Sequence, residues 1–232
     1  MLIIPLLICS IILSSTIIYK HSNDISVNSN ARSELPVIII DAGHGGFDGG
    51  TTASDGTIEK DINLKISLYL SEYLDLFGFK SILTREDDNS LEDNKNESIK
   101  NRKTSDIHNR MKIMEQTDNA LFVSIHQNHY SVEKYNGLQV FYSPTFSEES
   151  SLLAQNIQET VTEILQPQNN RQIKKCGASV YLINNAVKPA VLVECGFLSN
   201  SKETELLKTD DYQRKIAYCI SLGLFNYVNS KE

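Results

Sequence analysis

Cysteine is scarce in this chain, and the spacing of the few cysteines limits the chemistry they can do. The sequence has 4 cysteines among 232 residues. Three of them, Cys176, Cys195 and Cys219, follow the N-terminal apolar segment, and no two form a C-x-x-C pair. An odd number without such a pair argues against a disulfide framework and against a zinc site built from cysteine. We expect Cys195 and Cys219, which lie in apolar segments, to be packed thiols.

Positive charge is also in short supply. The chain has 22 Lys and Arg residues against 29 Asp and Glu residues, which gives a formal net charge of −7. A protein that binds nucleic acid needs a basic face, so we expect no nucleic-acid partner. The hydrophobic content of 41% is ordinary for a globular protein. The length is enough for one domain with a sizeable core.

An apolar run at residues 2–19 differs in kind from the rest of the chain. Its length, at roughly 18 residues, lies between a signal-peptide core and a short membrane span. A buried core helix is the alternative, but the polar stretch that follows favours export. We assign 1–20 to a signal peptide or membrane anchor, 21–35 to a linker and 36–229 to the folded domain. Cleavage stays open, because no Lys or Arg precedes the run and no A-x-A site follows it.

After this segment, strands and helices alternate. Apolar runs predict strands at 37–40, 79–84, 120–125, 137–143, 180–183 and 190–193. Helical spacing predicts helices at 57–77, 106–116, 147–165, 203–208 and 211–228. The polar stretch 86–105 is expected to be a solvated loop. This alternation predicts a three-layer α/β/α fold with a mostly parallel, twisted sheet of about six strands.

Side chains that can bind a metal or move a proton stand at the ends of three predicted strands. His44 follows the first strand in a glycine-rich loop, His126 ends the third, and Glu194 ends the last. Glu59 lies in the first turn of the helix predicted at 57–77. Because ligands of such sheets bind at the carboxyl ends of the strands, these side chains can share a site. Two histidines, one carboxylate ligand and a further carboxylate base are the set that zinc hydrolases use.

Each of these residues also has a plain structural interpretation. A histidine at a strand end is often a hydrogen-bonded structural residue, and a glutamate in a first helical turn complements the helix dipole. Glu194 is harder to explain in this way, since it follows the apolar run AVLV. A buried carboxylate is costly unless it is paired, coordinated or functional. His21, His108 and His129 lie in polar surroundings and are not expected to bind a metal.

A glycine-rich loop after a strand can also bind phosphate, and this alternative fails here. A third glycine would be needed at position 48, where the chain has Asp48, and a carboxylate beside a phosphate is repulsive. No GK[ST] motif follows. A nucleotide site is therefore excluded.

Five segments taken together resemble the family of zinc-dependent N-acetylmuramoyl-L-alanine amidases. They are IIIDAGHGGFDGG (38–50), EKDINL (59–64), LTR (83–85), FVSIHQN (122–128) and VLVECGFLSN (191–200). The resemblance covers essentially the whole chain after residue 36. It implies an amidase catalytic domain in which His44, Glu59 and His126 bind zinc and Glu194 is the catalytic glutamate.

The resemblance further implies hydrolysis of the amide between N-acetylmuramic acid and L-alanine in peptidoglycan. The segments QVFYS (139–143), NRQIK (170–174) and YQRK (212–215) are most similar to a sporulation-specific subtype. That subtype is implicated in forming muramic-δ-lactam in the spore cortex. The expected place of action is outside the cytoplasmic membrane, with membrane contact only through the N-terminal segment. No added wall-binding repeat is visible, so an accessory protein is an expected partner.

The substrate-binding residues and the exact activity leave alternatives. Arg85, Arg110 and Arg171 are candidates for binding stem-peptide carboxylates, because a guanidinium fork matches a carboxylate; structural ion pairs are the alternative for each. Asn128 is a further candidate for substrate binding. The chain could instead be a catalytically silent peptidoglycan-binding module, or a zinc peptidase that cuts the stem peptide. The intact set of four candidate catalytic residues argues against the silent module.

Overall fold

The computed structural model describes residues 35–231, and the predictions for residues 1–34 lie outside this range. Within it, no helix combines the length and the apolar character needed to cross a bilayer. The strands are β1 (Val37–Ala42), β2 (Ser81–Leu83), β3 (Ala120–Asn128), β4 (Gln139–Tyr142), β5 (Lys174–Lys175) and β6 (Ala190–Phe197). The helices are α2 (Glu59–Leu76), α3 (Ile99–Gln116), α4 (Ser147–Ile164), α5 (Tyr181–Asn184), α6 (Ser201–Leu207) and α7 (Asp210–Asn229).

The strands form one 6-stranded sheet in the order β2-β1-β3-β6-β4-β5. Strands β2, β1, β3 and β6 are mutually parallel, whereas β4 pairs antiparallel with β6, and β5, which is parallel to β4, shares its direction. The predicted α/β fold with a mostly parallel sheet is therefore confirmed. Parallel pairing brings the carboxyl ends of β1, β3 and β6 to one edge of the sheet.

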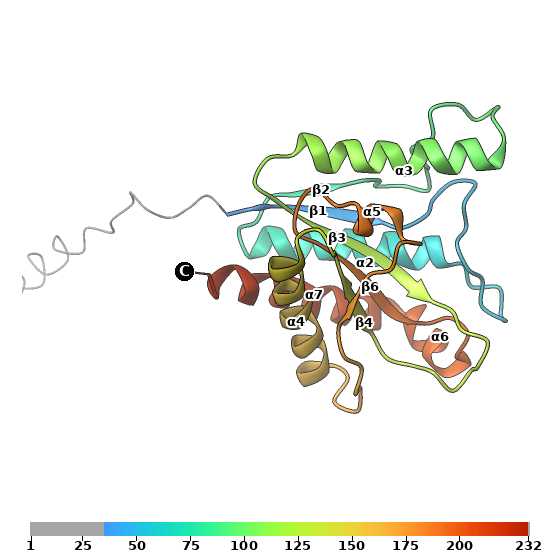
Figure 1. Cartoon of the computed structure of the whole chain (residues 1–232). Coiled ribbons are helices and arrows are strands. Elements are labelled where there is room, and N and C mark those ends of the chain that lie inside the picture. Colours follow the sequence, from blue (N-terminus) through green and yellow to red (C-terminus); the bar gives the residue numbers. More distant parts are fainter. Residues whose placement is uncertain (1–34, 232) are drawn as a thin grey trace, which may run out of the picture. The chain divides into compact units, whose positions relative to one another are not determined.

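Helices cover both faces of the sheet (Figure 1). Alternate side chains of β3 point to opposite faces, as the two-residue repeat of a strand requires. Val123 packs in the larger core with α2, α4 and α7, whereas Phe122 packs in the smaller core with Met111 and Met114 of α3. Both residues are fully buried. These two cores are the physical basis of the three-layer arrangement.

Helix α3 begins earlier than the sequence pattern predicts. The stretch 86–105 was expected to be a loop, but the helix starts at Ile99, after Ser98. The Ser98 side chain caps this end by accepting a hydrogen bond from the Asn101 backbone N–H (3.3 Å). The turns added here are largely polar, so they lack the apolar spacing by which a helix is detected in a sequence.

A second difference concerns the strand predicted at 180–183. This segment forms the one-turn helix α5, and its Ile183 packs into the core beneath α3. A run of four residues with apolar character is too short to separate a strand from a helix.

Helix α7 meets α4 at close range at Gly223. A Cβ at this position would lie 2.7 Å from Ile157 Cα and 3.1 Å from the carbonyl oxygen of Asn156. Alanine is the better helix former by about 1 kcal/mol, but overpacking a core typically costs about 1–3 kcal/mol. We therefore expect Gly223→Ala to lower the free energy of unfolding in urea denaturation. Asn226→Ala, on the exposed face of α7, should not lower it. A Gly223→Ala protein more stable than the parent would contradict the close contact.

The three cysteines of the described chain are free and buried. Cys195 lies in the sheet and Cys219 in α7, and both are essentially inaccessible. Burial raises the pKa of all three thiols, to about 11 for Cys219. The prediction that Cys195 and Cys219 are packed thiols is confirmed.

Candidate metal and catalytic site

The three predicted metal ligands meet at the carboxyl edge of the sheet. His44 Nε2 lies 3.2 Å from Glu59 Oε1, and His126 Nδ1 lies 3.0 Å from the same oxygen. One ligand atom from each residue lies within 4.8 Å of the other two. Two imidazole nitrogens and one carboxylate oxygen form a donor set that zinc accepts. The residues present therefore fit a zinc ion.

The glycine-rich loop after β1 allows the ligands to approach this closely. A Cβ on Gly43 would lie 2.3 Å from His126 Nε2, and a Cβ on Gly50 would lie 2.5 Å from Glu59 Oε2. His44 has a φ of 63°, in the left-handed region that residues other than glycine rarely adopt. The loop therefore holds its histidine in an unusual backbone conformation.

Further hydrogen bonds orient the candidate ligands. His44 Nδ1 lies 3.0 Å from Asp48 Oδ2. Glu59 Oε2 accepts a hydrogen bond from the Thr51 backbone N–H (2.8 Å), and Oε1 accepts one from the Gln127 N–H (3.1 Å). Such outer partners fix the orientation of metal ligands. From the sequence, Asp48 was expected only to disfavour phosphate, and its contact with His44 was not predicted, although its spacing of four residues from a candidate histidine is a usable signal.

The site concentrates negative charge around the imidazoles. Burial by itself lowers the pKa of His44, but hydrogen bonds with Asp48 and Glu59 outweigh it and raise that pKa to about 9. Burial raises the pKa of Glu59, but hydrogen bonds with His126 and His44 hold it well below its ordinary value. Carboxylates that draw a proton onto an imidazole also favour a metal cation at the same place.

Glu194 lies beside these residues, and one of its carboxylate oxygens lacks a hydrogen-bond partner within residues 35–231. It is the β6 partner of His126 on β3. Its Oε2 is buried and has no hydrogen-bond partner in the described chain. Burial raises the pKa of Glu194 to about 7, helped by the charge of Glu59 and opposed by His126 and His44. A buried carboxylate oxygen without a partner is costly, so we expect it to face a group that binds at this site.

A β-bulge follows Glu194 immediately. The register pairs His126 with Glu194 and then Asn128 with Phe197, so β6 carries one extra residue between the two pairs. Bulges bend a strand, re-aim side chains and are common beside active sites. This irregularity lies at the point where β6 delivers the carboxylate to the sheet edge.

The site opens into a cavity of about 250 Å³ whose walls include His44, His126, Arg110 and residues 179–183 around α5.

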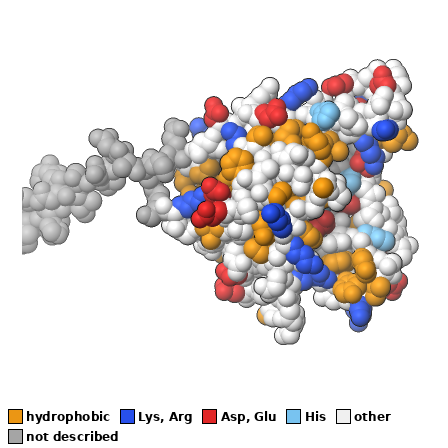
Figure 2. Space-filling model, viewed as in Figure 1, with side chains coloured by type: hydrophobic (Ala, Val, Ile, Leu, Met, Phe, Trp, Pro, Cys, Tyr) orange, Lys and Arg blue, Asp and Glu red, His pale blue; other side chains and the backbone are white. Residues whose placement is uncertain are grey.

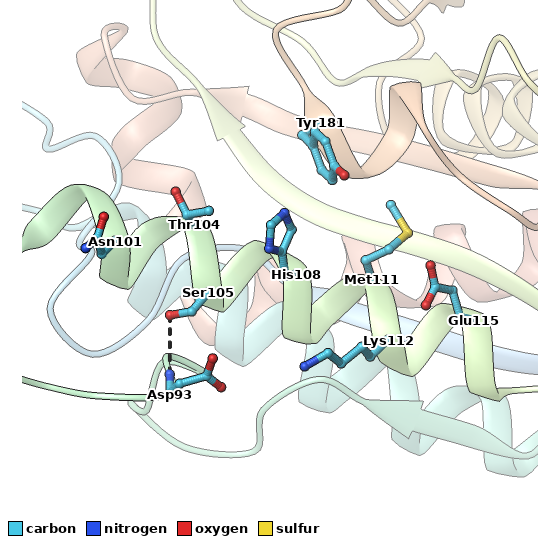
Figure 3. A pocket seen from close by; sticks show the side chains of 9 residues that line it. All are labelled: Asp93, Asn101, Thr104, Ser105, His108, Met111, Lys112, Glu115 and Tyr181. Atoms are coloured by element: carbon cyan, nitrogen blue, oxygen red, sulfur yellow. Dashed lines mark hydrogen bonds between the residues drawn. The ribbon is translucent and has the colours of Figure 1, made fainter. Parts of the chain in front are cut away.

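A second pocket of about 480 Å³ lies on the outer side of α3, where Tyr181 faces His108 (Figure 3). None of the four predicted metal-binding and catalytic residues lines the second pocket. On the face seen in Figure 2, charged side chains of both signs are interspersed with apolar ones.

Two of the three predicted substrate arginines are engaged inside the fold. Arg85 and Arg110 are buried, and their guanidinium groups donate to internal acceptors. These contacts favour the structural alternative for both, and their binding of stem-peptide carboxylates stays a prediction. Arg171 lies at the surface, with its guanidinium carbon 4.4 Å from the centre of the Phe197 ring. Asn128 ends β3, two residues beyond His126.

The sequence profile described as N-acetylmuramoyl-L-alanine amidase matches residues 38–226. The chain belongs to this family. The germination-specific N-acetylmuramoyl-L-alanine amidase of Bacillus subtilis (strain 168) is 34% identical over 195 residues, which are 84% of this chain and 81% of the relative. The predicted membership of the amidase family is therefore confirmed.

Solved structures agree with this assignment. The CwlD amidase from Clostridioides difficile, in complex with the GerS lipoprotein, has a TM-score of 0.80 and 42% identity, and the match covers 84% of this chain and 99% of that one. The amidase AmiC2 of Nostoc punctiforme has a TM-score of 0.72 and 27% identity over 85% of this chain and 99% of that one. This amidase is accordingly a hydrolase that acts on an amide bond of peptidoglycan.

Proposed function

We propose that this amidase uses zinc, held by His44, Glu59 and His126, to cleave the bond between N-acetylmuramic acid and L-alanine, with Glu194 as the catalytic residue. The observation that carries the proposal is the convergence of the three ligand side chains beside a buried carboxylate oxygen without a partner. A metal-assisted hydrolase needs both side chains that hold the metal and a nearby group that can accept a proton from water.

Zinc, when bound, supplies a Lewis acid and lowers the pKa of water toward neutrality. Side chains of the protein orient the ligands and transfer the protons. Asp48 holds the His44 ring through Nδ1, so Nε2 faces the ligand oxygen of Glu59. Glu194 takes a proton from the attacking water and returns it to the leaving nitrogen of L-alanine. Burial raises the pKa of Glu194 above its ordinary value, which favours this role, because a general acid-base catalyst works best with a pKa near the working pH.

We further propose that the substrate is the peptidoglycan of the spore cortex, where the reaction contributes to muramic-δ-lactam formation. The germination-specific name of the Bacillus subtilis relative supports this. The domain at 36–229 would then act outside the cytoplasmic membrane, after export directed by residues 1–20. Because the CwlD amidase was solved with a lipoprotein, we propose an accessory protein as a partner of this chain too.

Mass spectrometry of digested muropeptides tests the activity. We expect the zinc-loaded protein to release intact stem peptides and leave free lactyl groups on the glycan, and a chelator to stop this release. Shortened stems that remain attached to the glycan would instead show a peptidase. Unchanged muropeptides would show a binding module.

A further inference from the structure

A layer of buried charged and polar residues lies beneath the candidate metal site. Asp41, Ser124 and Arg110 stand on the α3 side of the sheet, and all three are buried. Ser124 is two residues before His126 on the same strand, so this layer is roughly 6–7 Å below the ligand. Ser124 Oγ donates to Asp41 Oδ2 at 2.6 Å. The mechanism above uses none of these residues.

Arg110 is the centre of this layer, and its N–H groups are directed at specific acceptors. Nε donates to Asp106 Oδ2 (2.8 Å), and Nη1 donates to Asp41 Oδ1 (2.5 Å) and to the Ala42 carbonyl oxygen (2.9 Å). Nη2 donates to the carbonyl oxygen of His44 at 2.7 Å. The two carboxylates thus fix the plane of the guanidinium. The remaining N–H groups donate to the backbone of the loop after β1 that carries His44.

Arg85 also donates hydrogen bonds to the backbone of this loop. Its Nε donates to the Ala42 carbonyl oxygen (2.9 Å) and its Nη2 to that of Gly43 (3.1 Å). Three successive carbonyl groups, those of residues 42, 43 and 44, therefore accept hydrogen bonds from two buried guanidinium groups. These are the residues at which the chain leaves β1 and enters the left-handed conformation of His44.

This arrangement is difficult to explain as a device for stability alone. A buried ion pair is weak evidence for stability, because desolvation of the charges can exceed their attraction. Apolar residues of similar volume could fill the same space. They could not donate to the carbonyl groups of Ala42 and His44. The function that only the guanidinium can serve is to hold the backbone of His44.

We propose that Arg110 is a positioning residue, which fixes His44 in its left-handed conformation and thereby sets the affinity of the site for zinc. The inference rests on the proposed function only in taking this site as the zinc site. It also gives α3, which supplies no ligand, a part in metal binding. Because outer partners of metal ligands typically change affinity by about 10- to 100-fold, an effect of that size is expected.

The test compares Arg110→Lys with Met114→Ala. Lysine keeps the charge but lacks the planar fork that meets Asp41 and two carbonyl groups together. Met114 lies on the same helix, is fully buried and belongs to the smaller core, so its truncation weakens the packing of α3 against the sheet without removing a hydrogen bond to the loop. Zinc affinity is measured by competition with a fluorescent chelator, and the melting temperature is measured without metal.

We expect Arg110→Lys to raise the zinc dissociation constant about 10- to 100-fold, with KM for peptidoglycan unchanged and kcat largely restored at saturating zinc. Met114→Ala should lower the melting temperature and keep the parent affinity. Equal zinc affinity in Arg110→Lys and the parent would overturn the proposal. A matching loss in Met114→Ala would also overturn it, because Arg110 would then act only through general stability.

Asp106→Asn covers the case in which Arg110→Lys does not fold. It removes one of the two carboxylates that orient the guanidinium, at a partly exposed position, and a loss of a few-fold in zinc affinity is expected. Parent affinity in Asp106→Asn, with no folded Arg110→Lys, would overturn the proposal. A parent chain that binds no zinc at all would instead contradict the proposed function.

Discussion

Glu194→Gln is expected to keep its zinc and to lose about 10²- to 10⁴-fold in kcat/KM, the usual contribution of a general acid-base catalyst. Glutamine has almost the same shape as glutamate but cannot take a proton from water or return it to the leaving nitrogen. Because Glu194 is not among the three converging ligand residues, the substitution should leave metal binding intact. Lactyl-end release measures the activity, and elemental analysis measures the zinc.

Glu203→Gln is the matched control. Glu203 is also a buried glutamate near the carboxyl edge of the sheet, but its oxygens accept hydrogen bonds from the backbone N–H groups of Gly137 and Phe197 (2.8 Å each). We expect this variant to melt at a lower temperature while it keeps near-parent activity at 25 °C. Near-parent activity in Glu194→Gln would remove Glu194 from the catalytic role.

His126→Ala is expected to lose the metal itself. The substitution removes one of the three converging donors, and a carboxylate and a single imidazole make a much poorer zinc site than the full set. Since a ligand that binds only the folded protein stabilises it, zinc should raise the melting temperature of the parent but not that of His126→Ala. Zinc per chain after dialysis gives a second measurement.

His129→Ala controls for the loss of a histidine from the same segment. His129 is exposed, three residues beyond His126, so its removal should leave one zinc per chain and the thermal shift intact. Stoichiometric, tightly held zinc in His126→Ala would show that the metal does not bind through this residue.

The part of the site that could be predicted from the sequence is the part that a parallel sheet imposes. His44, Glu59 and His126 are far apart along the chain, and no local spacing joins them. What these residues share is their position: each stands at the end of a buried strand or at the start of the helix that follows one. Parallel pairing of β1 with β3, and of β3 with β6, then brings the strand ends together without any further information.

Other features depend on contacts that have no signature along the chain. The early start of α3 at Ile99 and the one-turn helix α5 are decided by a cap and by packing against α3, not by apolar periodicity. Asp41 did carry a usable signal, because a carboxylate directly after four apolar residues is as unexpected as Glu194. Its partner Arg110 lies 69 residues away along the chain. Because no local pattern joins two residues so far apart in the sequence, the ion pair of Arg110 with Asp41 could not be predicted.

The reactivity of the three buried thiols in the described chain reports on local unfolding of the structure around them. Without a disulfide among them, each can react with a soluble labelling reagent only when the structure around it opens. Cys195 in the sheet and Cys219 in α7 lie in different layers, so the two labelling rates would show whether the helical layer detaches before the strands separate. Measuring the extent of modification at each of these two cysteines over time would thus map how the fold comes apart, with no mutation.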